Sequence, residues 1–290
     1  MRIALAALSL GLVLACASSS VPAARGADAS VFSGLGTWVD IYDRPVYAAP
    51  EATAARIAAR GVRVVWVETA NYGASVDVVD PLRLGRFVEA LHARGLRVVG
   101  WYLPGHVRPA LDVRRALAML AFRTPKGEAL DGIALDIEAT TLANVGLRSR
   151  RAVALTQRVR RAAGEVPLAI VPLNPRGLER RPTAWPRYPW QALAASSDAI
   201  APMVYTGGAL RGFDATYGYV TRSLRLLREY TGDPELPIHV VGGVADRLGP
   251  AELAGFVEAV RDDGGIIGVS LYDWQTTPAR AWKRLASLRP

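Results

Sequence analysis

Short apolar runs alternate along most of the chain with longer segments in which apolar residues recur at helical spacing. The runs are rich in valine and isoleucine and predict eight strands, at 36–41, 62–67, 96–102, 132–137, 166–171, 198–204, 237–242 and 265–272. Helices are predicted between them, several with proline in the first turn, at 50–60, 81–94, 109–122, 147–163, 215–230, 250–262 and 278–287. The connection 172–197 is rich in proline and aromatic residues and predicts only a short helix near 189–195.

This alternation determines the expected fold class. Strands that are separated by helices pair in parallel through right-handed crossovers. Eight such units within 34–290 fit an α/β fold, a single (β/α)8 TIM barrel, by count and length. An open doubly wound sheet is the alternative, but no glycine-rich phosphate loop follows the first strand.

The first residues predict export. Arg2 precedes an apolar run that ends at Ala15, which indicates a signal peptide over 1–15. This run is too short for a permanent membrane span. Residues 16–33 are rich in alanine and serine and predict a flexible tether before the barrel.

Cys16 is the only cysteine, so no intramolecular disulfide is possible. It follows Val13-Leu14-Ala15, and this sequence resembles the lipobox of bacterial lipoproteins. The resemblance implies lipidation of Cys16 and a protein anchored to a membrane of the cell envelope. Cleavage after Ala17, at the A-x-A of residues 15–17, is the alternative and would discard the cysteine.

The chain carries a formal charge of +9, almost wholly from arginine, since Lys126 and Lys283 are the only lysines. The arginines are scattered through every predicted helix, which favours solvated helix faces over a nucleic-acid surface. We therefore expect no nucleic-acid partner.

The predicted strand 132–137 ends in a pair of carboxylates, Asp136 and Glu138. Side chains alternate along a strand, so these two point to one face, and Ile133, Leu135 and Ile137 point to the other. Neighbouring carboxylates push their pKa values apart, which suits one of them to act as an acid in glycoside cleavage. The alternative is a structural role, with Asp136 and Glu138 paired to arginines in the segment that follows the strand.

Other polar and aromatic residues follow the predicted strands, where the active sites of such barrels form. The strand ends carry Trp38, Asp40, Glu68, Asn71, Trp101, Tyr102, His106, Asn174, Met203, Tyr205, Asp246, Tyr272, Asp273 and Trp274. Aromatic rings beside carboxylates are typical of sugar sites. As substrate-binding residues we predict Trp38, Asp40, Glu68, Tyr102, Asn174, Asp273 and Trp274. Trp185 and Trp190 either wall a groove or fix the long fifth connection.

The sequence contains no H-x-x-x-H or H-E-x-x-H pattern and no pair of cysteines, so we predict no metal site. We also expect no cofactor.

Three segments together resemble glycoside hydrolase family 18, the chitinase-type barrel. They are D-G-I-A-L-D-I-E at 131–138, M-V-Y-T at 203–206, and Trp274. The resemblance implies that Glu138 is the general acid and that Asp136 orients the N-acetyl group of the substrate. It also implies that Tyr205 hydrogen-bonds this group, whose carbonyl oxygen is the internal nucleophile. The family has further carboxylates where this chain has Ala134 and Thr206.

A second resemblance is to the family 25 lysozymes. It rests on Asp40, Asp136, Glu138 and the segment A-R-G-L-R-V-V-G-W-Y at 93–102. It implies peptidoglycan as the substrate, with Asp40 or Asp273 assisting Glu138.

Both resemblances imply an exported glycoside hydrolase that acts on N-acetylated glycans, either chitin-like or peptidoglycan. The alternative is a catalytically inactive, carbohydrate-binding (lectin-like) barrel lipoprotein, which Ala134 and Thr206 favour.

Overall fold

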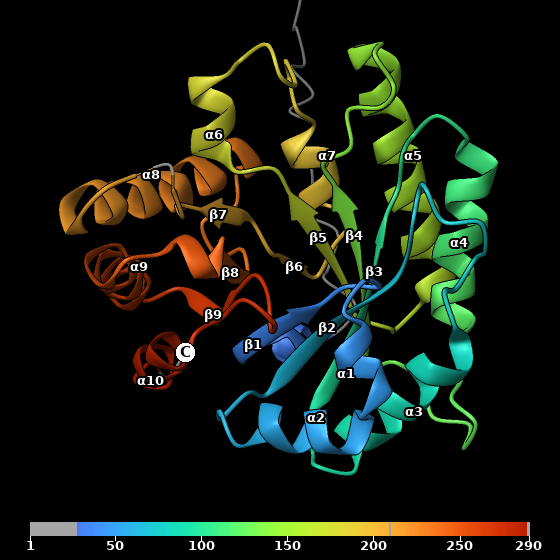
Figure 1. Ribbon diagram of the computed structural model, residues 1–290. Coiled ribbons are helices and arrows are strands. Elements are labelled where there is room, and N and C mark those ends of the chain that lie inside the picture. Colours follow the sequence, from blue (N-terminus) through green and yellow to red (C-terminus); the bar gives the residue numbers. More distant parts are fainter. Residues whose placement is uncertain (1–27, 209, 289–290) are drawn as a thin grey trace, which may run out of the picture.

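The computed structural model describes residues 28–208 and 210–288 and forms a closed parallel barrel surrounded by helices (Figure 1). Its strands are β1 (Gly34–Val39), β2 (Val64–Asn71), β3 (Arg97–Leu103), β4 (Gly132–Ile137), β5 (Leu168–Pro172), β6 (Ala199–Ile200), β7 (Met203–Tyr205), β8 (Ile238–Gly243) and β9 (Ile266–Leu271). Each strand pairs in parallel with its neighbours, and β1 pairs with β9 to close the ring. The predicted α/β barrel is confirmed.

The sixth strand of the barrel is interrupted. Residues 198–204 were predicted as one strand, whereas β6 and β7 are separated by Ala201 and Pro202. Proline has no backbone N–H to donate to a neighbouring strand. Both pieces still pair with β8, so β6 and β7 together occupy one position of an eight-stranded ring.

The helices cover the outside of the ring. They are α1 (Arg44–Ala48), α2 (Pro50–Ala58), α3 (Pro81–His92), α4 (Pro109–Ala121), α5 (Val145–Ala163), α6 (Pro175–Arg180), α7 (Trp190–Ala194), α8 (Phe213–Thr231), α9 (Pro250–Asp263) and α10 (Ala279–Leu285). Proline lies in the first turn of α2, α3, α4 and α9, as the sequence predicts. The sequence did not predict α1 and α6, which are only five and six residues long.

The fifth connection is fixed by its aromatic residues. Trp185 is buried, donates from Nε1 to the Ser149 hydroxyl (2.9 Å) and lies under the Arg148 guanidinium, 4.0 Å from the ring centroid. Trp190 packs on Tyr188, with ring centroids 4.5 Å apart. Both tryptophans therefore hold the loop against the barrel.

Three tryptophans fill the barrel interior. Trp38 and Trp66 stack with their ring centroids 4.6 Å apart, and Trp101 meets Trp38 edge-on at 5.9 Å. Ala134 is fully buried in the same cluster, where its small side chain leaves space for the rings. The interior is thus packed and apolar, and it forms a floor beneath the carboxyl ends of the strands.

Residues of the predicted tether close the amino-terminal end of the barrel. Ala29–Phe32 form a 3-10 turn, and Phe32 is fully buried with its ring stacked on Trp66 at 5.5 Å. His239 Nδ1 donates to the Phe32 carbonyl (2.6 Å), and burial lowers the pKa of His239 to about 4, which keeps it neutral. The folded domain therefore includes residues 29–33, and the predicted extent of the tether to residue 33 is wrong. The signal peptide and Cys16 lie outside the described residues.

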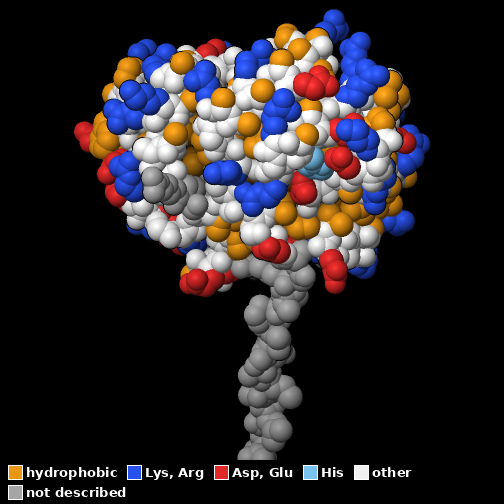
Figure 2. All heavy atoms as spheres, turned by 90° about the horizontal axis from the view of Figure 1, so that it is seen from below, with side chains coloured by type: hydrophobic (Ala, Val, Ile, Leu, Met, Phe, Trp, Pro, Cys, Tyr) orange, Lys and Arg blue, Asp and Glu red, His pale blue; other side chains and the backbone are white. Residues whose placement is uncertain are grey.

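The face of the molecule drawn in Figure 2 carries side chains of both charges. In the view from below, Lys and Arg side chains lie scattered, with Asp and Glu between them (Figure 2). Within 28–208 and 210–288, no helix has both the length and the apolar character that crossing a bilayer requires.

We expect Phe32→Ala to lower the free energy of unfolding by about 3 kcal/mol, because it leaves a cavity beneath Trp66. Urea denaturation measures this change. The control is Val107→Ala at an exposed position, with an expected effect below about 0.5 kcal/mol. Equal effects of the two substitutions would show that Phe32 does not contribute to the stability of the folded domain.

Candidate active site

A pocket of about 430 Å³ opens at the carboxyl ends of the strands. Carboxylates and aromatic rings dominate its lining, which comprises Asp40, Tyr42, Glu68, Asn71, Tyr72, Gly73, Trp101, Leu103, Asp136, Glu138, Met203, Tyr205 and Tyr272. This is the edge where the strand-end rule places the site.

Asp136 and Glu138 enter the pocket from the end of β4. Ile133, Leu135 and Ile137 pack in the core between strands and helices. The alternation along β4 is therefore as predicted, and both carboxyl groups share one cavity.

Burial determines the electrostatics of this pair. Asp136 is 6% exposed, and its Oδ1 has no hydrogen-bond partner among the described residues. Desolvation raises the pKa of Asp136 well above its ordinary value, and the charges of Glu138 and Glu68 raise it further. Burial also raises the pKa of Glu138. Because both groups are desolvated over an apolar floor, ionising the two together is costly, and this favours a state in which the pair retains one proton.

Glu68 joins this group through an irregularity in β2. The register between β2 and β3 shifts between Glu68 and Ala70, so the alternation of side chains restarts, and both Glu68 and Asn71 face the pocket. The Glu68 carboxylate accepts from the Ile41 N–H (3.1 Å) and from Asn71 Nδ2 (3.1 Å). Burial nevertheless raises the pKa of Glu68 to about 7.

Asp40 also lines the pocket, and two hydrogen bonds hold its carboxylate in place. Its carboxylate accepts from the Tyr272 hydroxyl (3.1 Å) and from the Tyr42 N–H (2.7 Å). The Tyr42 hydroxyl in turn accepts from Asn71 Nδ2 (3.1 Å). Hydrogen bonds thus connect Tyr272, which follows β9, through Asp40 and Tyr42 to Asn71 of β2.

Tyr205 and Trp101 belong to the aromatic part of the lining. Tyr205 ends β7 and lies 6.0 Å from Tyr272 between ring centroids. Desolvation and the nearby Asp136 raise the pKa of Tyr205, so its hydroxyl stays protonated and can donate to a ligand. The Trp101 indole N–H has no partner among the described residues.

Several predicted substrate-binding residues lie elsewhere. Trp38 is buried in the barrel interior below the pocket, where Nε1 donates to the Ser270 hydroxyl (2.8 Å). Tyr102 points out of the barrel and donates to Asp112 of α4 (2.7 Å). Neither residue lines the pocket, which contradicts the prediction.

Asn174, Asp273 and Trp274 also lie outside the lining. The side-chain oxygen Oδ1 of Asn174 caps α6 and accepts from the Arg176 backbone N–H (2.8 Å). Asp273 forms a turn in which its carboxylate accepts from the Thr276 N–H (2.9 Å). Trp274 packs against Trp282, with ring centroids 5.4 Å apart.

The two positions at which this chain departs from the family 18 pattern are both buried. Ala134 contributes to the tryptophan floor, and Thr206 is fully buried without lining the pocket. The floor beneath Asp136 is therefore apolar.

Within the described residues, one group of three carboxylates has the spacing of metal ligands. Oxygen atoms of Asp40, Asp43 and Asp273 lie within 4.8 Å of one another. Burial, and then the charges of Asp40 and Asp273, raise the pKa of Asp43 to about 7. Carboxylate oxygens are the ligands that hard divalent cations prefer.

No protein-family model and no curated protein matches this sequence. Its fold is similar to that of a GH18 chitinase from Pseudoalteromonas aurantia, with a TM-score of 0.60 and 14% identity over 88% of this chain and 99% of that one. It is also similar to a chitinase from Bacteroides thetaiotaomicron, with a TM-score of 0.64 and 11% identity over 87% and 93%. The Bacillus cereus spore cortex-lytic enzyme SleL aligns with a TM-score of 0.61 and 9% identity over 88% and 73%. These TM-scores show a shared fold, and at such low sequence identity they show the fold alone.

We expect Asp136→Asn to stabilise the protein by about 1 to 2 kcal/mol at pH 8, because it removes a buried ionisable group. The folded-state pKa of Asp136 lies above the unfolded one, so the wild type loses stability as the pH rises between these two values. The gain should vanish near pH 4. Thermal unfolding across this range measures it, with exposed Asp246→Asn as the control. A gain that does not depend on pH would contradict the raised pKa.

Proposed function

We propose that this protein is a glycoside hydrolase that cleaves N-acetylated glycans, chitin-like or peptidoglycan, in the 430 Å³ pocket. The observation that carries the proposal is the buried pair of Asp136 and Glu138 at the end of β4, with the pKa of both carboxyl groups raised. The chitinases and the spore cortex-lytic enzyme with similar barrels support this class of reaction.

In the proposed reaction, Glu138 donates its proton to the glycosidic oxygen while the bond from this oxygen to the anomeric carbon breaks. The acetamido carbonyl oxygen of the substrate attacks the same carbon and forms a cyclic intermediate. Asp136 orients the acetamido group, and the Tyr205 hydroxyl donates a hydrogen bond to it. The Glu138 carboxylate then takes a proton from the water that opens the ring, which restores the acid.

Asp40 is the candidate for assistance in the mechanism implied by the second resemblance. It lines the same pocket as Glu138, and Tyr272 and Tyr42 hold its carboxylate. Of the predicted binding residues, Asp40 and Glu68 line this pocket.

A lectin-like protein is the second candidate function. Ala134 and Thr206 are fully buried and supply no carboxylate, whereas the aromatic and hydrogen-bonding lining of the pocket is complete. Such a pocket could bind a glycan without cleaving it.

We expect Glu138→Gln to lower the rate of glycan cleavage by about 100- to 10,000-fold, because the shape is kept and the transferable proton is lost. The assay is mass spectrometry of products from chito-oligosaccharides and peptidoglycan, using residues 28–290. Glu51→Gln on α2 is the matched control at an exposed position. A fully active Glu138→Gln variant would refute the mechanism. No products from the wild type, with binding retained, would favour the lectin-like candidate.

Tyr205→Phe should lower kcat by about tenfold, the equivalent of one hydrogen bond of about 1.4 kcal/mol, and should leave the Kd for substrate nearly unchanged. The reason is that the acetamido oxygen gains charge as the reaction proceeds. Steady-state kinetics and calorimetry separate the two quantities. Equal losses in kcat and affinity would reduce Tyr205 to a binding contact.

Export and lipid anchoring at Cys16 form part of the proposal and rest on the sequence. We expect the full-length chain to incorporate radiolabelled palmitate in a bacterial host and the Cys16→Ser variant to incorporate none. Equal labelling of the two proteins would place the lipid elsewhere.

A further inference from the structure

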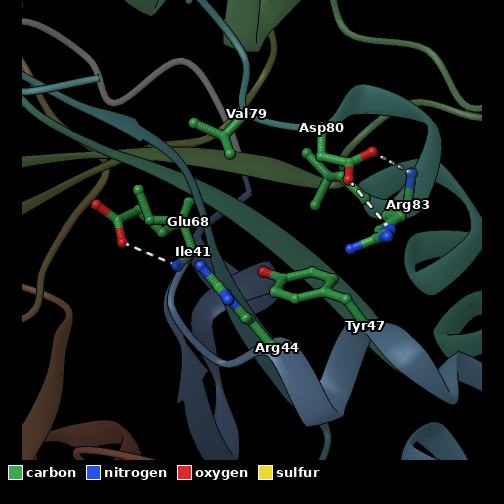
Figure 3. Close-up of a pocket in the computed structure, with 8 residues that line it drawn as sticks. Ile41, Arg44, Tyr47, Glu68, Val79, Asp80 and Arg83 are labelled. Carbon is green, nitrogen blue, oxygen red and sulfur yellow. Dashed lines mark hydrogen bonds and ion pairs between the residues drawn. The ribbon is translucent and has the colours of Figure 1, made fainter. Parts of the chain in front are cut away.

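A second cavity, of about 230 Å³, adjoins the active-site pocket, and Glu68 lines both. Its other lining residues come from α1, α3 and the segments before these helices (Figure 3): Ile41, Arg44, Tyr47, Val79, Asp80, Arg83 and Leu84. The proposed reaction does not use this side cavity.

The side cavity offers an unpaired positive charge. Asp80 is already occupied, because its carboxylate caps α3 by accepting from the Arg83 N–H (3.3 Å) and pairs with Arg83 Nε (3.2 Å). The Arg44 guanidinium forms no hydrogen bond or ion pair with any residue of 28–208 and 210–288. Arg44 is therefore available to a ligand.

Tyr47 places an unsatisfied hydroxyl at the same cavity. Its oxygen is buried and has no hydrogen-bond partner among the described residues, although its ring is fixed edge-on against Phe87 at 5.6 Å. An unpaired buried hydroxyl is costly unless a ligand satisfies it. Figure 3 shows the side chains of Tyr47 and Arg44 projecting from α1 toward one space.

Glu68 opposes an anion here less than an exposed glutamate would. Burial raises its pKa to about 7, and two hydrogen bonds hold its carboxyl group against Ile41 and Asn71. Glu68 lines both cavities, and the fraction of it that is protonated, which grows as the pH falls below about 7, carries no charge.

We propose that the side cavity binds a carboxylate carried by the glycan, with Arg44 and the Tyr47 hydroxyl as its donors. Arginine suits this role because its planar fork matches the two oxygens of a carboxylate. The inference rests on the proposed function and narrows its substrate class to acidic N-acetylated glycans. The sugar in the active-site pocket, or its neighbour, carries the acidic substituent.

Two matched ligands test this proposal. One is a peptide-free peptidoglycan hexasaccharide, in which alternate sugars carry a lactyl carboxylate, and the other is the same hexasaccharide with these groups converted to amides. Affinities are measured by calorimetry in the Glu138→Gln background, which prevents cleavage. We expect the acid form to bind about tenfold more tightly than the amide form.

Adding Arg44→Gln should abolish this preference by weakening the acid form about tenfold and leaving the amide form unchanged. Arg86→Gln is the matched control, since Arg86 is exposed on α3 and does not line the side cavity. Equal loss for both ligands, no preference before the substitution, or no binding of either ligand would overturn the inference. Cleavage by the wild type is assayed separately, so a binding preference without cleavage would reject the proposed hydrolase and keep the carboxylate site.

Discussion

The site depends on one constraint, which is the cost of ionising carboxyl groups above an apolar floor. Trp38, Trp66 and Trp101 fill the barrel interior, and Asp136 lies directly beyond them with one carboxyl oxygen unpaired. In water this group would be ionised at neutral pH, but here desolvation favours its protonated form. The same packing that stabilises the barrel therefore raises the pKa of the pair to which the proposed acid, Glu138, belongs.

The amino-terminal end of the barrel shows how this floor is kept dry. Phe32 stacks on Trp66 from below, and neutral His239 connects the Phe32 carbonyl to Ser270, whose hydroxyl accepts from Trp38. His239, Ser270 and Trp38 are hydrogen-bonded to one another or to the Phe32 carbonyl, whereas the buried Trp66 indole N–H has no partner among the described residues. The low dielectric beneath Asp136 is thus maintained from the opposite end of the barrel.

The sequence predicted the fold and the acid pair because both follow from periodicity. Strand alternation placed Asp136 and Glu138 on one face and three apolar residues on the other. It failed for the third strand, where valine, glycine, tryptophan and tyrosine are all compatible with either face, and Tyr102 was chosen where Trp101 lines the pocket. Counting alternate residues inward from Val99 would have selected Trp101.

Other errors have causes that no periodic pattern reveals. Asn71 faces the pocket because of a one-residue irregularity in β2, and Phe32 is buried although its neighbours resemble a linker. Trp38 and Trp274 lie at strand ends, yet packing against other tryptophans holds Trp38 in the core and Trp274, which is partly buried, against it. A rule based on strand ends finds the correct edge of the barrel but does not tell which side chains at this edge are exposed.

The absence of a carboxylate at position 134 does not by itself remove an acid from this site. A third carboxylate next to Asp136 would raise its pKa by repulsion between like charges, whereas an apolar neighbour raises it by desolvation. The two environments differ in what they leave for the substrate. Above the tryptophan floor, Asp136 Oδ1 has no partner among the described residues, so a hydrogen-bonding group on the glycan can satisfy it without displacing a protein contact. In the proposed reaction, recognition by Asp136 and protonation by Glu138 therefore depend on the same desolvated pair of carboxyl groups.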